Sequence, residues 1–303
     1  MHIFNTLFAA GIILACSSAA FAGDWKMKRG AGPIPAETGQ AAPNGLPDGL
    51  VAVSPESTDL RSAWYTQPTT RYRHGILGDI IEAGGIAVAD ANGVTQELTL
   101  PEELVFEDRT PRLIDLDGFG KTHIVTIIAH REKGAAIAVF GLVNGELRLL
   151  DQTPFIGRSN RWRNVAGFAD FDGDGHLQIA EVVTPHIGGT LRFWTWNKGK
   201  LEPSGDIFGF SNHFIGSREQ RLSVVDDFND DGKSDIALPD ASRRNLRIIG
   251  FEGKAREDKQ VIEIATIPLP ARIDKAMDIR VEVNKPIITI GLDDGSIWDV
   301  HRP

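Results

Sequence analysis

The stretch FADFDGDGHLQIAEVV, residues 168–183, decides the fold. It places three alternating aspartates and a glycine between two runs, NVAGFA and IAEVV, that favour β-strands. Two sister stretches follow the same plan: LIDLDGFGKTHIVTI from Leu113 and VVDDFNDDGKSDIAL from Val224. Each of the three has an isoleucine nine residues after its first loop aspartate. The chain therefore repeats one unit, made of a strand, a tight acidic loop and a second strand.

The loop at 170 also fits a calcium pattern that is known between two helices, D-x-[DN]-x-[DN]-G-x5-E, with Glu181 at the twelfth position. That pattern needs an amphipathic helix on each side, and no window of this chain predicts a long one. The sister loops have Thr126 and Leu238 in place of Glu181. We therefore interpret the match as coincidence and predict a strand on each side of the loop.

Two weaker copies extend the repeat in both directions. RYRHGILGDIIEAGGIAV is anchored on Asp79, and MDIRVEVNKPIITIGL on Asp278. The five anchors, Asp79, Asp115, Asp170, Asp227 and Asp278, lie 36, 55, 57 and 51 residues apart. Repeats of this length that consist of short strands are typical of propellers. The sequence predicts an all-β protein, a β-propeller with five blades, with six or seven blades as the alternatives.

A propeller of this kind needs its ring of blades to be closed. Only 25 residues follow Asp278, too few for the rest of a four-stranded blade. Residues 49–68, GLVAVSPESTDLRSAWYTQP, precede the first anchored repeat as a fourth strand precedes each of the others. We predict that this N-terminal strand completes the last blade and closes the ring, which leaves no open sheet edge.

The first residues predict export to the periplasm or the medium. Residues 1–22 combine the apolar run IFNTLFAAGIILA with the cleavage site AFA, as a signal peptide does. Cys16, the single cysteine, lies in this segment, and Leu14 is bulky for a lipoprotein site, so we expect no lipid anchor. The mature chain then has no thiol, which excludes disulfides and thiol catalysis. Residues 23–48, rich in Gly, Pro and Ala, predict a linker, and 49–303 the propeller.

Charge and hydropathy narrow the range of partners. The formal net charge of -9 argues against binding to nucleic acid. After the signal peptide no segment reaches the roughly 18 consecutive apolar residues that a transmembrane helix needs. We expect a monomer.

The acidic loops resemble the calcium loops of FG-GAP and VCBS repeat β-propellers, as in the integrin α-subunit head and many bacterial secreted proteins. The family pattern, close to D-x-[DN]-x-D-G-x-x-D-[IL], lies between the innermost strand of a blade and the next strand. The resemblance implies calcium, which prefers such hard oxygen ligands. The alternative is an aspartate-rich turn without an ion. The implied ligands are Asp227, Asn229, Asp231 and Asp235; Asp170, Asp172, Asp174 and Gln178; and Asp115 and Asp117, where Phe119 and His123 depart from the pattern.

If the acidic loops join first and second strands, the other connections lie on the opposite face. Arginine forks suit carboxylates and phosphates, and an indole can stack on a sugar. The sequence therefore predicts a basic face for an anionic, glycan or protein ligand. The alternative is structural, because an arginine stands six residues before four of the five anchors and such a residue can pair with a neighbouring blade. The candidate ligand-binding residues are Arg73, His74, Arg161, Trp162, Arg163, His186, His213, Arg218 and Arg221.

No catalytic motif accompanies this face. The chain has no G-x-S-x-G, H-E-x-x-H, G-x-G-x-x-G or phosphate loop. We therefore favour a binding or interaction module and propose no catalytic residue. Two alternatives stay open: a periplasmic hydrolase that uses a histidine such as His186 or His213, and a scaffold without a small ligand.

Overall fold

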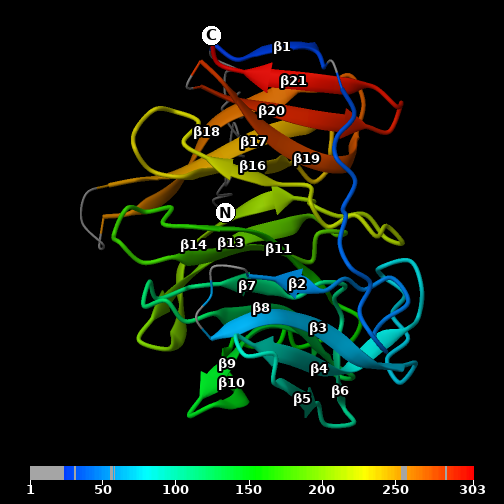
Figure 1. Ribbon diagram of the computed structural model, residues 1–303. Coiled ribbons are helices and arrows are strands. Elements are labelled where there is room, and N and C mark those ends of the chain that lie inside the picture. The colour runs from blue at the N-terminus through cyan, green and yellow to red at the C-terminus, as the bar shows by residue number, and fades with distance from the viewer. Residues whose placement is uncertain (1–23, 31, 55–56, 58, 254–257, 284) are drawn as a thin grey trace, which may run out of the picture.

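The computed structural model describes residues 24–30, 32–54, 57, 59–253, 258–283 and 285–303. Over these residues the chain forms antiparallel sheets, and none of it forms a helix that could cross a membrane (Figure 1). The all-β class predicted from the repeats is confirmed. The predicted signal peptide, with Cys16, lies outside the described residues.

Two of the four sheets are simple meanders in which chain order equals sheet order. One contains β11 (Arg163–Ala169), β12 (Gln178–Val183), β13 (Gly189–Asn197) and β14 (Lys200–Phe210). The next contains β15 (Val224–Asp226), β16 (Asp235–Pro239), β17 (Asn245–Glu252) and β18 (Gln260–Pro268). Each begins with the strand that precedes an acidic loop.

A nine-stranded sheet holds two further runs of four strands. The first run is β2 (Ala52–Val53), β3 (Leu60–Thr69), β4 (Glu82–Asp90) and β5 (Thr95–Thr99). The second is β7 (Arg112–Ile114), β8 (His123–His130), β9 (Gly134–Val143) and β10 (Glu146–Gln152). The short strand β6 (Leu104–Phe106) joins the runs, because it pairs with both β4 and β8.

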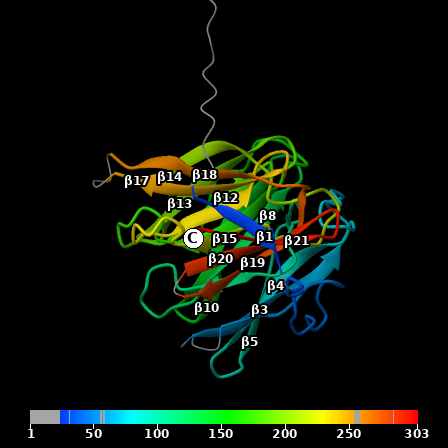
Figure 2. The same cartoon turned by 90° about the horizontal axis from the view of Figure 1, so that it is seen from above.

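The last sheet contains β19 (Ile273–Glu282), β20 (Lys285–Leu292) and β21 (Ile297–His301), and its fourth strand comes from the N-terminus. That strand is β1 (Lys26–Arg29), which pairs with β21 from Lys26↔His301 to Arg29↔Trp298 and lies beside it in Figure 2. Trp25 packs on Phe228 with ring centroids 6.4 Å apart, and the Arg29 guanidinium lies 4.6 Å from the Trp298 ring.

The prediction that residues 49–68 complete the last sheet was therefore wrong. Within that range β3 pairs with β4 over most of its length, and β2 pairs with β3. The hairpin partner is close in sequence, and the pairing buries Leu60, Ala63 and Tyr65. The strand that does join the last sheet falls within the range 23–48, and its sequence KMKR is charged and mostly exposed. Charged residues are usual on an edge strand, and a strand that carries them cannot be predicted from a pattern of apolar residues.

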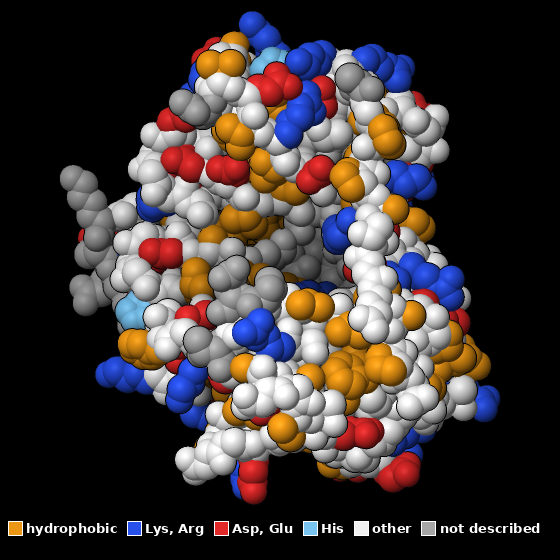
Figure 3. All heavy atoms as spheres, viewed as in Figure 1, with side chains coloured by type: hydrophobic (Ala, Val, Ile, Leu, Met, Phe, Trp, Pro, Cys, Tyr) orange, Lys and Arg blue, Asp and Glu red, His pale blue; other side chains and the backbone are white. Residues whose placement is uncertain are grey.

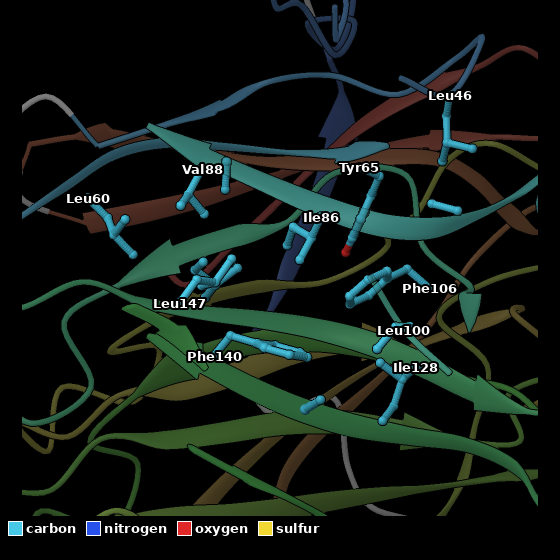
Figure 4. Packing of buried hydrophobic residues seen from close by; sticks show 14 of the residues in the cluster. Leu46, Leu60, Tyr65, Ile86, Val88, Leu100, Phe106, Ile128, Phe140 and Leu147 are labelled. Carbon is cyan, nitrogen blue, oxygen red and sulfur yellow. The ribbon is translucent and has the colours of Figure 1, made fainter. Parts of the chain in front are cut away.

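Side chains from both faces of the central strands form the core. Every residue of β8 except His130 is buried, because neighbouring layers cover both of its faces. In the core of the nine-stranded sheet, Tyr65, Ile86, Phe106 and Phe140 pack together (Figure 4). Burial of a side chain of this size contributes roughly 1.5–3 kcal/mol to folding. The acidic loops and the Arg- and His-containing connections extend from the ends of these packed strands.

Residues 32–48, called here the N-terminal segment, run from the last sheet towards the first run of strands (blue in Figure 1). The segment borders the hollow at the centre of the face seen in Figure 3. Arg109 anchors it through Nη1 to Glu37 Oε2 and Nε to Asp48 Oδ2, both at 3.0 Å. A cavity of about 260 Å³ lies between Glu37 and residues 165–168 of β11. The N-terminal segment therefore covers first strands of the sheets.

Candidate functional site

The three acidic loops occupy one structural position. Residues 115–122 join β7 to β8, residues 170–177 join β11 to β12, and residues 227–234 join β15 to β16. Each loop thus connects the first and second strands of its run. The prediction of a strand on each side of the loops is confirmed, and the helix-pair interpretation is excluded.

The loops share one hydrogen-bond scheme, in which the first aspartate accepts backbone N–H groups from the turn. Asp170 accepts from Asp174 at 3.0 Å and from Gly175 at 2.8 Å. Asp227 makes the same two bonds, at 3.2 Å and 2.8 Å. Asp115 accepts from the residues three and five places on, at 2.9 Å and 2.7 Å. The glycine five places on has a φ of +87° after Asp170 and +84° after Asp227, a conformation that favours glycine.

The side chain eight residues after the first aspartate closes each loop. It accepts the backbone N–H next to that aspartate, at 2.7 Å for Gln178, 3.0 Å for Asp235 and 3.3 Å for His123. All three side chains are buried. Burial, together with the charges of Asp231 and Asp227, raises the pKa of Asp235 to about 7. Three chemically different residues therefore serve one structural purpose, which accounts for the departures from the acidic pattern at 123 and 178.

The loop at 170 brings its carboxylates within reach of one ion. Ligand oxygens of Asp170, Asp172 and Asp174 all lie within 4.8 Å of one another. The ammonium of Lys259 lies 3.0 Å from Asp172 Oδ1 and 3.9 Å from Asp174 Oδ2, and its side chain is only 8% exposed. A buried ammonium thus lies against two of the three carboxylates of this loop. The donor set fits calcium, and Lys259 would compete with it.

The loop at 227 repeats this geometry with a different balance of charge. Asn229 Oδ1 accepts the N–H of Asp231 at 2.8 Å, as Asp172 Oδ1 accepts that of Asp174 at 3.1 Å. Asn229 contributes a neutral amide oxygen, and Asp235 adds a buried carboxyl. Lys233 Nζ lies 3.7 Å from Asp231 Oδ2. Among the described residues, however, the carboxylates of this loop do not form a set of three within 4.8 Å, as those of the loop at 170 do.

The loop at 115 fits calcium less well. Ligand atoms of Asp115, Asp117 and His123 also lie within 4.8 Å of one another, but one of them is an imidazole nitrogen. His123 Nδ1 is already engaged by the backbone, and Phe119 is 83% exposed where the pattern has an acid. Calcium prefers oxygen ligands, so two carboxylates and a nitrogen make a weak site for it.

The first repeat departs from the predicted phase. Asp79 lies in the β3–β4 connection, between the second and third strands of its run, so its alignment with the acidic loops was wrong. The equivalent connection is that between β2 and β3, where Asp59, directly before β3, accepts through Oδ1 the N–H of Thr122 at 3.0 Å and of Leu60 at 2.7 Å. The β2–β3 connection lacks the alternating aspartates, which hid this phase in the sequence.

The remaining connections gather at the other end of the strands. Neighbouring strands are antiparallel, so connections between second and third strands lie opposite the acidic loops, as do the links from one run to the next. Residues 70–81, 184–188 and 240–244 are of the first kind, and 153–162 and 211–223 of the second. The predicted Arg- and His-containing connections therefore do lie at one end of the molecule.

Histidines and aromatic rings form a continuous ladder beneath these connections. His186 Nε2 lies 2.9 Å from His213 Nδ1. Trp162 stacks on His186 at 6.0 Å between centroids and contacts His213 at 4.7 Å. Phe214 stacks on the other side of His213, and the Arg243 guanidinium lies 4.9 Å from the Phe214 ring. Trp162 is 2% exposed, so its indole holds the ladder together and offers no face to a sugar, contrary to the prediction.

The ladder continues to His74 through a buried glutamate. Trp162 Nε1 donates to the backbone oxygen of Glu107 at 2.9 Å, and Glu107 Oε1 lies 2.5 Å from His74 Nδ1. Burial and the charge of Asp108 raise the pKa of Glu107, while burial and the charge of Arg161 lower that of His74 to about 4. Both shifts favour the neutral forms of the two groups, so burial opposes a charged pair here.

The predicted arginines divide into separate roles. Arg218 pairs with Asp48 and Asp79, at 2.8 Å and 3.1 Å. The other four have different surroundings. Arg163 is buried against Glu181, Arg221 pairs with Glu219 and also donates to the backbone of Pro35, and Arg161 donates to the backbone of Asn160, while Arg73 is exposed. The structure thus brings together His74, Trp162, His186 and His213, but ion pairs occupy Arg163, Arg218 and Arg221.

Sequence reasoning missed the buried acids and amides at this end. Glu82, Glu107 and Asp108 are 2% exposed or less, although the face was expected to be basic. Asn212 is fully buried, and neither of its side-chain polar atoms has a hydrogen-bond partner among the described residues. The pair Glu107–Asp108 stands just after a strand signal, VF, but nothing local indicates that both would be buried.

No protein-family model matches the chain, and no curated protein matches it in sequence.

Proposed function

We propose that the chain is an exported, calcium-binding β-propeller of the FG-GAP/VCBS kind, which acts as a binding or interaction module. The observation that carries the proposal is the hydrogen-bond scheme that the three acidic loops repeat at one structural position. A scheme of this kind in three successive runs of strands is expected of a repeat that evolved around one function. Asx-rich turns that arose separately would not also share the position of the side chain that closes the loop.

The arrangement of the strands supports five blades. There are five runs of four strands, counting the N-terminal strand β1 in the last. First strands of successive runs lie side by side, as in β2 with β7, β11 with β15 and β15 with β19. Last strands do the same, as in β5 with β10, β10 with β14 and β14 with β18. Runs stacked edge for edge in this way are what blades around a common axis would give.

Calcium is assigned to two of the loops. Asp170, Asp172 and Asp174 would hold one ion and Asp227, Asn229 and Asp231 another, while the loop at 115 stays empty. Bound calcium would neutralise the gathered carboxylates and hold the turns rigid. A binding module needs this rigidity because the same strands present the connections at the other end.

The His- and Arg-containing end is the proposed ligand site, for an anionic, glycan or protein ligand. A binding role is favoured over a hydrolase because the described residues place no nucleophile within hydrogen-bond distance of His74, His186 or His213. The hydrolase remains the second candidate, since Glu107 orients His74 as an acid orients a catalytic base.

Thermal unfolding tests the calcium assignment. Protein stripped with chelator should melt at a lower temperature than protein in millimolar calcium, and calcium at 100 times its Kd should add about 2.7 kcal/mol of stability per site. Asp231→Asn should remove one of two ions measured by isothermal titration. Asp230→Asn, a change in the exposed neighbouring residue, is the matched control and should keep both ions. Equal melting temperatures with and without calcium would refute the assignment.

A further inference from the structure

One face of the first run of strands lacks the packing that covers the other. On the covered face, Tyr65 and Ile86 lie in the core of the nine-stranded sheet (Figure 4). Side chains alternate along a strand, so the neighbouring residues lie on the opposite face. There Trp64 of β3 is directly opposite Ala87 of β4, and Ala87 is directly opposite Glu97 of β5. Trp64 and Glu97 therefore lie on one side of the sheet with β4 between them, their backbones roughly 10 Å apart.

A cleft follows β4 on this face. Its volume is about 500 Å³, which is in the range of sites that bind small ligands. The floor is low because β4 contributes small residues, Gly85 and Ala87, between the larger side chains of β3 and β5. The walls are formed by Asn44 of the N-terminal segment, Trp64 and Thr66 of β3, and Thr95 and Glu97 of β5. An indole and several polar side chains therefore face one common space.

Trp64 differs from the other tryptophans of the chain in its contacts. Each of the other five has an aromatic ring contact or an N–H hydrogen bond inside the protein: Trp25, Trp162, Trp194, Trp196 and Trp298. Trp64 is half-buried in the cleft wall, and neither its ring nor its Nε1–H has such a partner among the described residues. An indole normally uses both its apolar ring and its N–H. The Trp64 side chain is therefore free to do so with a ligand.

The Glu97 carboxylate is held in a fixed position at the cleft. Its Oε1 accepts from Thr66 Oγ1 and from Gln67 Nε2, both at 2.7 Å. Gln67 has a left-handed backbone within β3, with a φ of +55°, and residues held in this conformation cluster at ligand sites. Glu97 Oε2 accepts no donor among the described residues, and Glu97 alone among the lining residues is charged. The cleft therefore offers a fixed acceptor to hydroxyl groups and repels anions.

We propose that this cleft, called here the Trp64 cleft, binds a neutral glycan. One sugar ring stacks its C–H face on the Trp64 indole, and its hydroxyl groups donate to Glu97 Oε2. The polar side chains of Asn44 and Thr95, which line the same space, bond further hydroxyl groups. Hydrolysis is not proposed, because glycosidases use a pair of carboxylates and this cleft offers one. The inference rests neither on the calcium assignment nor on the His- and Arg-containing end.

Isothermal titration with defined tetrasaccharides tests the proposal. The neutral probes are cellotetraose, maltotetraose, mannotetraose, galactotetraose and chitotetraose, and tetragalacturonate is the acidic probe. We expect at least one neutral probe to bind with a Kd below about 1 mM, which is within reach of the titration. Tetragalacturonate should bind more weakly, because its carboxylates would meet Glu97. Binding of the neutral probe should also change the tryptophan fluorescence of the protein, and Trp64→Phe should reduce that change.

Two pairs of variants locate the site. Trp64→Ala should weaken binding about tenfold or more, as loss of an aromatic anchor usually does, whereas Trp298→Ala removes a half-buried indole outside the cleft and should leave the affinity unchanged. Glu97→Ala should also weaken binding about tenfold, because a hydrogen bond to a charged group is lost. Glu102→Ala, a change in an exposed acid of the following link, is its control.

Ala87→Val blocks the cleft without removing any of its ligands. A β-branched residue suits a strand, so this variant should melt like the wild type and yet bind the glycan more weakly. The proposal is overturned if none of the neutral probes binds, if tetragalacturonate binds more tightly than they do, or if the controls lose as much affinity as Trp64→Ala and Glu97→Ala. Light scattering that shows a dimer which Trp64→Ala dissociates would assign the face to a second copy of the chain and would overturn it too.

Discussion

Replacement of Arg163 by methionine should be one of the most destabilising single changes in this chain. Arg163 Nη1 lies 2.8 Å and 3.1 Å from the two carboxylate oxygens of Glu181, and both side chains are almost fully buried. Methionine keeps the apolar stem but leaves the Glu181 carboxylate with one described donor, Trp194 Nε1 at 2.7 Å. Removal of one partner from a buried ion pair typically costs about 3–5 kcal/mol. The Arg163 bonds to Thr153 and Pro154 are lost too.

A double variant separates the charge effect from the packing effect. In Arg163→Met/Glu181→Gln no charge is left buried, and the glutamine oxygen can still accept from Trp194. We expect the double variant to be more stable than Arg163→Met by about 2 kcal/mol, because an unpaired buried carboxylate is the largest cost of the single change. Arg148→Met, which breaks a surface pair with Glu146, is the control and should cost less than about 1 kcal/mol.

Urea unfolding in saturating calcium, followed by tryptophan fluorescence, gives these free energies if the slope stays constant among variants. The reasoning is refuted if Arg163→Met costs less than 1 kcal/mol, or if the double variant loses as much as the two single variants added together. Either result would mean that the buried Arg163–Glu181 pair contributes little to stability.

Three further predictions follow from the same contacts. Lys259→Met should raise the calcium affinity of the loop at 170 and leave that of the loop at 227 unchanged. Calcium titration with and without Lys259→Met in the Asp231→Asn variant, which keeps only the site at 170, measures the first effect; an unchanged affinity there would mean that the ammonium does not compete. A chain that begins at Gly30 should melt lower and aggregate sooner than one that begins at Asp24, because loss of β1 exposes the edge of β21, and light scattering during a thermal scan would record it. Burial lowers the pKa of His74, His186 and His213 to about 4, 3 and 4, below the usual 6.5. Their contribution to the free energy of unfolding is therefore complete above pH 6.5 and falls towards pH 4, by up to about 1.4 kcal/mol per pH unit for each histidine. Urea unfolding at several pH values should show a shallower fall for His186→Asn.

The acidic loops could be predicted because their information is local. Alternating aspartates with a glycine at the fifth place determine a turn by their own hydrogen bonds, and the β-branched runs on each side determine strands. The sister loops then gave the phase of the repeat. The same reasoning failed for Asp79, where an arginine stands six residues before the aspartate but Val88 stands nine residues after it and the alternating aspartates are missing.

The place of β1 in the last sheet and the ladder could not be predicted, because their partners are remote in sequence. Lys26–Arg29 pairs with residues about 270 positions away, and nothing in KMKR marks it as a strand apart from the charge that edges tolerate. Glu107 is bonded by Trp162 and His74, which come from two other connections. The sequence shows which residues can carry a charge. Whether such a residue is buried, and which group it then pairs with, depends on contacts between segments that are remote in the chain.

Two of the arginines that stand six residues before the anchors contact the N-terminal segment. Arg109 and Arg221 stand at the same phase in different repeats, and both reach this one segment, through Glu37 and Asp48 in one case and the backbone of Pro35 in the other. A residue repeated by the architecture thus holds a part of the chain that does not repeat. The N-terminal segment follows β1 closely in the chain, so the contacts of Arg109 and Arg221 also help to position β1 in the last sheet. Loss of Arg109 should therefore weaken the pairing of β1 with β21, although the two lie in different parts of the fold.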